Sequence, residues 1–251
     1  MLLQPLRGPG VRAHLAGMNY ASRAPALGRA GLSVSDNLWK TYRWMSLGLA
    51  LTGVVAMGVA GSPSAVEFLF ANRFLFYVLM FAQLGLVVAF SAVAQRVSTV
   101  TAAAMFLTYA ALSGVTFSTI FLVYTASSIA KVFFITGGSF AGLSVFGAIT
   151  KADLSGVGRF AIFAVIGILI ASLVNIFMAS TGLDWLISIV GVIAFGALTA
   201  YDTQKLKEMF AEGEVRGNLA IVGALTLYLD FINMFLLLLR LVGGRRGSSE
   251  Y

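Results

Sequence analysis

The chain has 251 residues, no cysteine and a formal net charge of +7. Hydrophobic residues make up 59% of it and charged residues only 11%, against about 25% charged residues in a typical soluble domain. The absence of cysteine excludes disulfides and thiolate metal sites, and a single histidine, His14, excludes a histidine-rich zinc site. These values predict one polytopic membrane domain.

The first 35 residues are rich in glycine, alanine and arginine and contain no apolar run that would make a signal peptide. We expect a disordered basic tail at residues 1–35, with Met18 as an alternative start of translation. A basic tail can bind nucleic acid, but ahead of membrane spans it is more typical of a cytoplasmic segment attracted to anionic lipid. We therefore predict no nucleic-acid partner. The remaining predicted parts are a membrane domain at 36–244 and a short C-terminal tail at 245–251.

Seven apolar segments follow the tail, each close to the about 20 residues that a helix needs to cross a bilayer. They lack the alternation of membrane-barrel strands, and no proline occurs after Pro63. We therefore predict an all-α integral membrane protein, a bundle of seven transmembrane helices. The weakest boundary separates the third segment from the fourth. The predicted spans are residues 44–60, 74–94, 100–124, 130–149, 160–178, 185–209 and 219–241.

Charges in the connections predict the orientation. Basic residues gather in the tail and in alternate connections, so the positive-inside rule places the N-terminus in the cytoplasm. Seven spans then put the C-terminus outside, although three arginines near it oppose that placement. Either the rule fails there or the last span is re-entrant; we expect seven full spans. The basic residues of the alternate connections are Arg96, Lys151, Arg159, Lys205, Lys207 and Arg216, and the opposing arginines are Arg240, Arg245 and Arg246.

Two aspartates, Asp202 and Asp230, lie within the last two predicted spans. A carboxylate at the membrane centre costs about 2.5–3.5 kcal/mol on insertion scales, so residues of this kind are mostly functional. From a rise of about 1.5 Å per residue, Asp202 lies about 8 Å inside if its helix leaves the membrane core around Lys207, and Asp230 lies about 16 Å deep. Helix tilt, or a break near Gly196, would bring them together. The alternative for Asp202 is a residue at the lipid headgroups beside Lys205.

If the two carboxyls meet, they share a proton, because two close carboxylates in a low-dielectric interior cannot both ionise cheaply. The pair would then sense pH and, when ionised, offer oxygen ligands to Ca²⁺. Arg96 is the predicted latch, because a guanidinium can hold a carboxylate bidentately. Its alternative role is an ordinary cytoplasmic anchor. We predict no catalytic residue and no cofactor beyond Ca²⁺ as a bound or transported ion.

These residues also carry a family resemblance. The stretches AYDTQKL, at 200–206, and LYLDFINMFLLLLRLVG, at 227–243, resemble the C-terminal signature of the Bax inhibitor-1 family, also called the transmembrane Bax inhibitor motif family. The resemblance covers about residues 36–244. It implies a bacterial inner-membrane protein with seven helices around a central last helix and, for some members, a pH-sensitive calcium leak. The family's aspartate pair would fall on Asp202 and Asp230, and its latching arginine on Arg96.

Three functions compete. The first is a pH-gated leak of Ca²⁺ or another cation across the lipid bilayer. The second is a non-conducting regulator that binds another membrane protein, such as a quality-control protease, which bacterial relatives also resemble. The third, an intramembrane aspartyl protease, is disfavoured because Asp230 follows Leu-Tyr-Leu rather than Gly-x-Gly. A small-xxx-small pattern at Gly138 and Gly142 is expected to pack inside the bundle, with docking of a partner as its alternative.

Overall fold

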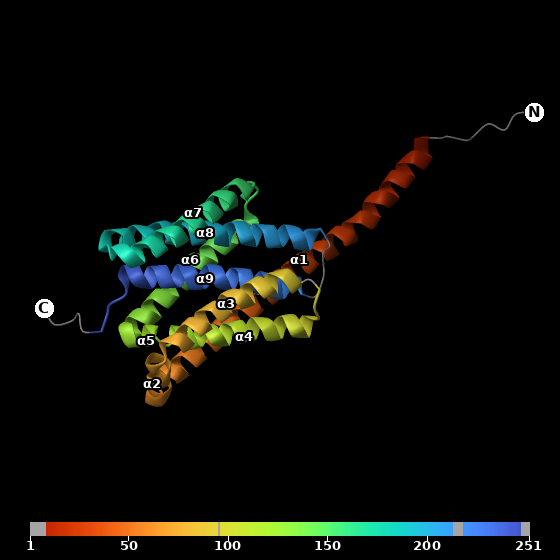
Figure 1. Ribbon diagram of the computed structural model, residues 1–251. Coiled ribbons are helices and arrows are strands. Elements are labelled where there is room, and N and C mark those ends of the chain that lie inside the picture. The colour runs from red at the N-terminus through yellow and green to blue at the C-terminus, as the bar shows by residue number, and fades with distance from the viewer. Residues whose placement is uncertain (1–8, 95, 213–217, 247–251) are drawn as a thin grey trace, which may run out of the picture.

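The computed structural model describes the backbone of residues 9–94, 96–212 and 218–246. Within these ranges the protein is all-helical, and its one β-type contact is an isolated bridge between Tyr124 and Arg245. The helices form a bundle that α1 crosses diagonally (Figure 1). Their bounds are α1 Pro9–Ala60, α2 Pro63–Ala71, α3 Arg73–Val93, α4 Thr99–Phe117, α5 Ile120–Val123, α6 Ala126–Ile149, α7 Ser155–Met178, α8 Thr181–Ala211 and α9 Leu219–Val242.

In the described part of the chain, six helical segments are long and apolar enough to cross a membrane. They match the first predicted span and the third to seventh. The second predicted span falls on α3, whose apolar stretch over the described side chains, Tyr77–Val93, is shorter than the other six. The all-helical, multi-pass class is therefore confirmed, and the count of seven spans stays a prediction.

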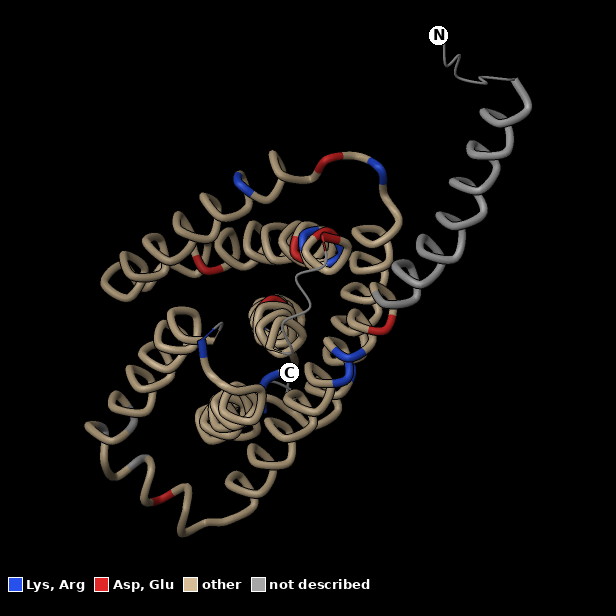
Figure 2. The backbone as a smooth tube through the Cα atoms, turned by 90° about the vertical axis from the view of Figure 1, so that its right-hand side faces the viewer, with Lys and Arg blue, Asp and Glu red and all other residues tan. Residues whose placement is uncertain are grey.

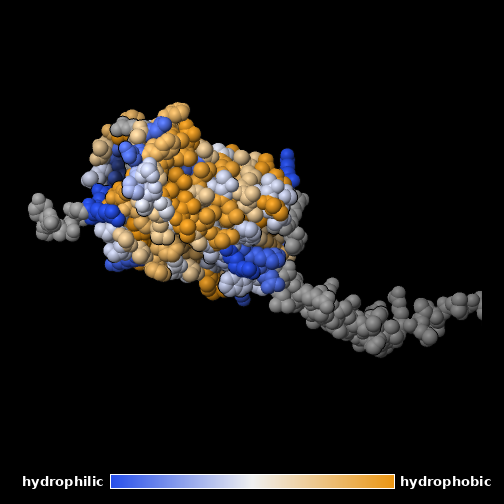
Figure 3. Space-filling model, turned by 90° about the horizontal axis from the view of Figure 1, so that it is seen from below, coloured by the Kyte–Doolittle hydropathy of each residue, from blue (hydrophilic) through white to orange (hydrophobic). Residues whose placement is uncertain are grey.

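The outer surface is suited to lipid. An apolar belt separates more hydrophilic ends of the molecule (Figure 3). Helix α7 faces outward most completely, with only 11% of its span buried, and its large exposed side chains include Phe160, Phe163 and Phe177. Because these side chains would meet water in a soluble protein, the belt is what a bilayer core would cover.

The N-terminal segment differs from the sequence prediction. Residues 1–35 are predicted to be a disordered tail, but the backbone of α1 is helical from Pro9 onward. Alanine, leucine and arginine, which favour helix, are frequent between Pro9 and the first apolar span, although Pro25 and the glycines there disfavour it. Residues 1–8 lie outside the described part of the chain.

The last helix crosses the whole bundle. Helix α9 is an unbroken helix of 24 residues, so the re-entrant alternative does not fit it. Just beyond its end, the amide of Gly244 donates to Ser128 Oγ at 2.9 Å, and the amide of Thr125 donates to the Gly244 carbonyl at 3.1 Å. The C-terminal segment is thereby fixed to the start of α6, at the end of the bundle opposite to the basic connections.

A polar turn joins α7 to α8 at that same end. Ala179 ends α7 in the left-handed region, with a φ of 47°. Asn175 closes the turn, since its Nδ2 donates to the Ser180 carbonyl at 3.1 Å and its Oδ1 accepts from the Ser180 amide at 3.0 Å. Its Nδ2 also reaches Asp184 Oδ1 at 2.8 Å, which places Asp184 next to its ion-pair partner Arg240.

Candidate functional site, a buried aspartate pair

The length of α8 decides the depth of Asp202. The helix continues past Lys207 to Ala211, so Asp202 lies nine residues before its end, and Asp230 lies eleven residues after the start of α9. At about 1.5 Å per residue the two positions differ by only about 3 Å in depth. The helix runs through Gly196 without interruption, so no break is needed to bring the aspartates together.

The carboxyl groups of Asp202 and Asp230 lie close enough to interact with each other. Two ionised carboxylates have only acceptor atoms, so a bond between them requires one shared proton. Asp230 is 4% exposed, and among the described residues its Oδ2 has no donor to satisfy it. A proton held between the two groups is the simplest way to satisfy that buried oxygen.

Helix α9 supplies the apolar surroundings of the pair. It has the largest buried share of the six spans, 67% against 44% or less for the others, and it packs against α1, α4, α6 and α8. Figure 2 shows it end-on among the other helices. Beside Asp230, the ring of Phe231 contacts those of Phe133 and Phe140. The ring of Phe231, the next residue after Asp230, is thereby fixed against α6.

Close backbone contacts hold the Asp202 segment of α8 in place. Gly147 of α6 lies against the backbone of Ala200, and Gly158 of α7 lies against the ring of Tyr201. Side chains larger than glycine would not fit at these two points. Asp202 therefore projects from a stretch of α8 that is fixed from two sides.

Gln204 ties α8 to the α6–α7 connection. Its Oε1 accepts from the amide of Leu154 at 3.0 Å, and its Nε2 donates to the carbonyl of Ala152 at 2.8 Å. In the same connection, Asp153 Oδ1 accepts from the amide of Ser155 at 2.8 Å, and the side-chain and backbone hydrogen bonds of Ser155 lower the pKa of Asp153. The basic end of the bundle is thus ordered next to the pair.

Arg96 lies in the turn after α3 and is exposed. The one ion pair between described residues joins Arg240 to Asp184 at 3.4 Å, so no latch between Arg96 and the pair is formed in this structure. The α3–α4 turn is nevertheless anchored to α9, because Asn218 Nδ2 donates to the carbonyls of Ala94 and Val97. Arg96 therefore lies at the end of the bundle where α9 begins.

Lys205 is the cation that acts on Asp202 from the same helix. Its Nζ lies 5.7 Å from the centre of the Tyr201 ring, a cation–π distance. The sequence alternative, in which Asp202 is merely a headgroup residue beside Lys205, does not fit its contact with the buried Asp230.

The pair alone is a poor resident metal site. Two carboxylates supply at most four oxygens, whereas Ca²⁺ takes six to eight oxygen ligands. In the described part of the chain no group of three or more Asp, Glu, His or Cys side chains is placed to hold a metal ion. Any Ca²⁺ that meets these carboxylates would keep part of its water shell, as a passing ion does.

Sequence reasoning missed a hydrogen-bonded junction between α1, α4 and α9. The hydroxyls of Thr52 and Tyr228 lie 2.8 Å apart, and Thr52 Oγ1 also lies 2.9 Å from the carbonyl of Ala110. Tyr228 is fully buried, with Phe106 and Tyr109 edge-on to its ring. Thr52 and Tyr228 are 176 residues apart, and no local pattern signals such a pairing.

The prediction for Gly138 and Gly142 was wrong. Both are exposed on α6, and a Cβ added at either would meet nothing within 4 Å. The glycines that permit close packing are Gly147 and Gly158 instead. The small-xxx-small pattern does not indicate which face of the helix packs in the bundle. In α6 the face that carries Gly138 and Gly142 points away from the bundle.

The comparison with known proteins covers the part of the chain that carries Asp202 and Asp230. A family model described as inhibitor of apoptosis-promoting Bax1 matches residues 34–247. The chain belongs to the Bax inhibitor-1 family. The match begins at the start of the first span and includes both aspartates.

Similar Bax inhibitor-1 proteins cover nearly the same length. The inner membrane protein YbhL of Escherichia coli K12 is 49% identical over 223 residues, covering 87% of this chain and 94% of that protein. An uncharacterised protein of Borreliella burgdorferi is 45% identical over 215 residues, or 84% and 93% of the two chains. One from Caulobacter vibrioides is 38% identical over 243 residues, or 90% and 97%. With its apolar helices, this chain is a multi-pass inner-membrane protein.

Proposed function

We propose that the protein is a pH-responsive cation leak of the inner membrane, with seven spans, a central last helix and the Asp202–Asp230 pair as its sensor. The observation that carries the proposal is the buried carboxyl of Asp230, whose Oδ2 has no donor among the described residues, with the carboxyl of Asp202 close enough to interact with it. Calcium is the proposed cargo, and the proposed role is not enzymatic. The burial of α9 supports its central place.

The proposed mechanism depends on the charge of the pair. As the pH falls, the pair becomes neutral and loses its attraction for a guanidinium or a cation. As the pH rises, the pair ionises, and two neighbouring negative charges repel each other unless a cation lies between them. Arg96 is the proposed internal cation for this role, and Ca²⁺ is its competitor. The two helices that carry the aspartates would separate or close according to which cation is present.

The test is Ca²⁺ flux into proteoliposomes from pH 6 to pH 8. We expect the wild-type flux to change with pH, and the double variant Asp202→Asn, Asp230→Asn to conduct equally at all pH values, because amides do not titrate. The variant should match the wild type at its most acidic. Asp184→Asn, which removes an exposed carboxylate at the other end of the bundle, is the matched control and should keep the wild-type profile.

A second candidate function is a non-conducting regulator that binds another membrane protein. The flux experiment separates the two. A correctly inserted wild-type protein that passes no Ca²⁺ at any pH would contradict the leak and favour the regulator. A pH-dependent flux that survives in the double variant would place the sensor elsewhere in the bundle.

A further inference from the structure

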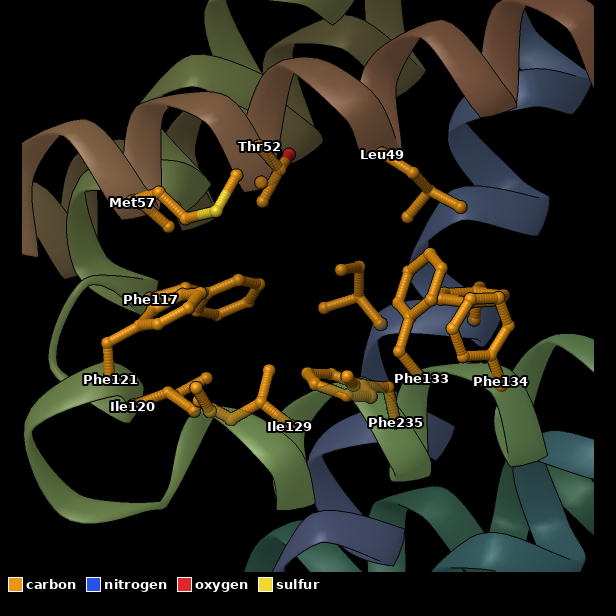
Figure 4. A pocket seen from close by; sticks show the side chains of 16 residues that line it. Leu49, Thr52, Met57, Phe117, Ile120, Phe121, Ile129, Phe133, Phe134 and Phe235 are labelled. Atoms are coloured by element: carbon orange, nitrogen blue, oxygen red, sulfur yellow. The ribbon is translucent and has the colours of Figure 1, made fainter.

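An apolar groove runs between α1 and α6 on the membrane-facing side of the bundle. Two cavities make it up and share Leu49, Phe133 and Phe231. The inner cavity, of about 460 Å³, lies toward the basic end of the bundle. The outer cavity, of about 380 Å³, lies toward the opposite end. Figure 4 shows the outer cavity, where side chains of α1 face those of α5, α6 and α9 across an open space.

The groove exists because α1 and α6 each pack on other helices. Helix α1 packs on α4, α8 and α9, and α6 packs on α8 and α9. Residues of α1 between Leu38 and Leu49 and residues of α6 between Gly137 and Ala148 line the inner cavity. Gly137, which has no side chain, and the methyl groups of Ala141 and Ala148 keep that cavity wide.

The basic end of the groove is flanked by cations on both sides. On α1, Trp39 lines the inner cavity and is 67% exposed, and Arg43 follows one turn later on the adjoining face, with Lys40 beside it. On the other side, Lys207 Nζ donates to the carbonyl of Ala148, which lines the same cavity, at 2.6 Å. An ammonium has three donors, so two remain for another acceptor.

Acidic residues also occur at this end, but they do not neutralise the three cations. Asp36 lies one turn before Lys40, and Glu208 follows Lys207. Neither forms an ion pair with another described residue. Arg43 and Lys207 therefore keep positive charge at the mouth of an apolar groove.

We propose that the groove binds an anionic phospholipid of the cytoplasmic leaflet. One acyl chain lies in the inner cavity between α1 and α6, and the phosphate lies between Arg43 and Lys207. Trp39 stands where an interfacial aromatic side chain meets the glycerol region. Basic sites between transmembrane helices on the cytoplasmic side suit anionic headgroups of this kind.

The charge favours a lipid over a transmembrane helix as the occupant. A helix would cover the apolar walls but leave Arg43 and Lys207 without an anion. A phospholipid supplies both an apolar chain for the groove and a phosphate for the cations at its mouth. The cavity volumes are within the range of about 300–1,000 Å³ that small-molecule ligands occupy in proteins.

Trp39 can report on the occupant directly. In a protein carrying Trp44→Phe and Trp185→Phe, Trp39 is the one remaining tryptophan. The protein is reconstituted in phosphatidylcholine that contains either brominated phosphatidylglycerol or brominated phosphatidylcholine, and the quenching of Trp39 is compared at equal mole fractions. We expect the anionic lipid to be preferred about fivefold, the factor for about 1 kcal/mol from one basic residue.

Two variants and two matched controls complete the test. Arg43→Gln should reduce the preference, because it removes one of the two headgroup cations, and Ala141→Phe should reduce it to near one, because it fills the cavity. Arg159→Gln removes an exposed cation at the same end, and Ala104→Phe enlarges an exposed side chain on α4; both should keep the preference. Equal quenching by the two lipids, or a preference that Arg43→Gln leaves intact, would overturn the proposal.

Discussion

Two glycines of α6 differ in what surrounds them, and the difference can be measured. Gly147 lies against the backbone of Ala200, whereas Gly142, little more than one turn earlier, faces open space. Backbone cannot rotate away as a side chain can, so the α6–α8 distance at Gly147 depends on the missing Cβ. The same contact holds the α8 segment that carries Asp202.

We expect Gly147→Ala to destabilise the protein by about 1–3 kcal/mol, the usual cost of forcing a methyl group into a packed interface. Gly142→Ala should be neutral or slightly stabilising, because alanine favours helix and nothing obstructs its methyl group. Unfolding in mixed micelles, followed by circular dichroism, measures both. Equal stability of the two variants would show that α6 and α8 are further apart than described.

The Thr52–Tyr228 hydrogen bond is a second residue-scale feature with a definite expected energy. Tyr228→Phe removes the hydroxyl and little volume, so we expect a loss of about 1 kcal/mol, the net value of a typical buried hydrogen bond. Thr52→Val should cost a similar amount. If the two hydroxyls bond to each other, the double variant should cost less than the sum of the single ones. Additive losses would contradict the bond.

At this scale the sequence singled out Asp202 and Asp230 but did not establish whether they touch. A carboxylate in an apolar span has a cost that is visible from composition, so Asp202 and Asp230 stand out. The depth estimate placed the membrane end of this helix around Lys207, whereas α8 continues for four further residues to Ala211, which brings Asp202 to nearly the depth of Asp230. Thr52 and Tyr228 are ordinary residues in apolar helices, and only the packing of α1 on α9 shows their pairing.

At the scale of elements, α8 acts together with the connection between α6 and α7. Gln204 is the link, because its amide bonds to the backbone of Ala152 and Leu154. A leucine at this position would keep the volume but leave the Leu154 amide and the Ala152 carbonyl without these partners. The connection would then open locally more often.

We therefore expect Gln204→Leu to speed hydrogen exchange in the 150–154 connection while leaving α9 unchanged. Exchange measured by mass spectrometry on the reconstituted protein tests this. Asn175→Leu is the matched control, since it removes an equivalent amide at the α7–α8 turn and should affect only that turn. Faster exchange throughout the bundle in the Gln204→Leu protein would instead indicate a global loss of stability.

Element boundaries show why hydropathy alone predicts a bundle of this kind incompletely. The third predicted span became α4 and the short α5, which together still make one apolar segment, Thr99–Val123. The short helix α2 was not predicted, although Ser62 followed by Pro63 is a good helix start: Ser62 caps the amide of Ala65. Hydropathy indicates how long and how apolar a segment is. The break between α4 and α5 and the start of α2 depend instead on local turns and capping.

At the scale of the whole molecule, the positive-inside rule and the helix order disagree at the C-terminus. Arg240 and Arg246 lie at the end of the bundle opposite to Lys151, because α9 crosses it and the 243–246 segment is pinned to the start of α6. The ion pair with Asp184 offsets part of the charge of Arg240. Orientation depends on the basic residues of all connections together, so this end can carry arginine without reversing the orientation of the protein in the membrane.

The absence of cysteine allows a clean test of this arrangement. In single-cysteine variants of right-side-out vesicles, a membrane-impermeant maleimide should label Arg246→Cys and Ser64→Cys. It should leave Lys151→Cys and Ser98→Cys unlabelled until the membrane is permeabilised. All four positions are exposed at helix connections or ends, so access to the reagent depends only on the side of the membrane.

The Ser64 and Ser98 pair also decides whether α3 is a span, because the two residues lie before and after α3 in the chain. Labelling of both from outside would leave six spans, and α3 would then lie along the bundle without crossing.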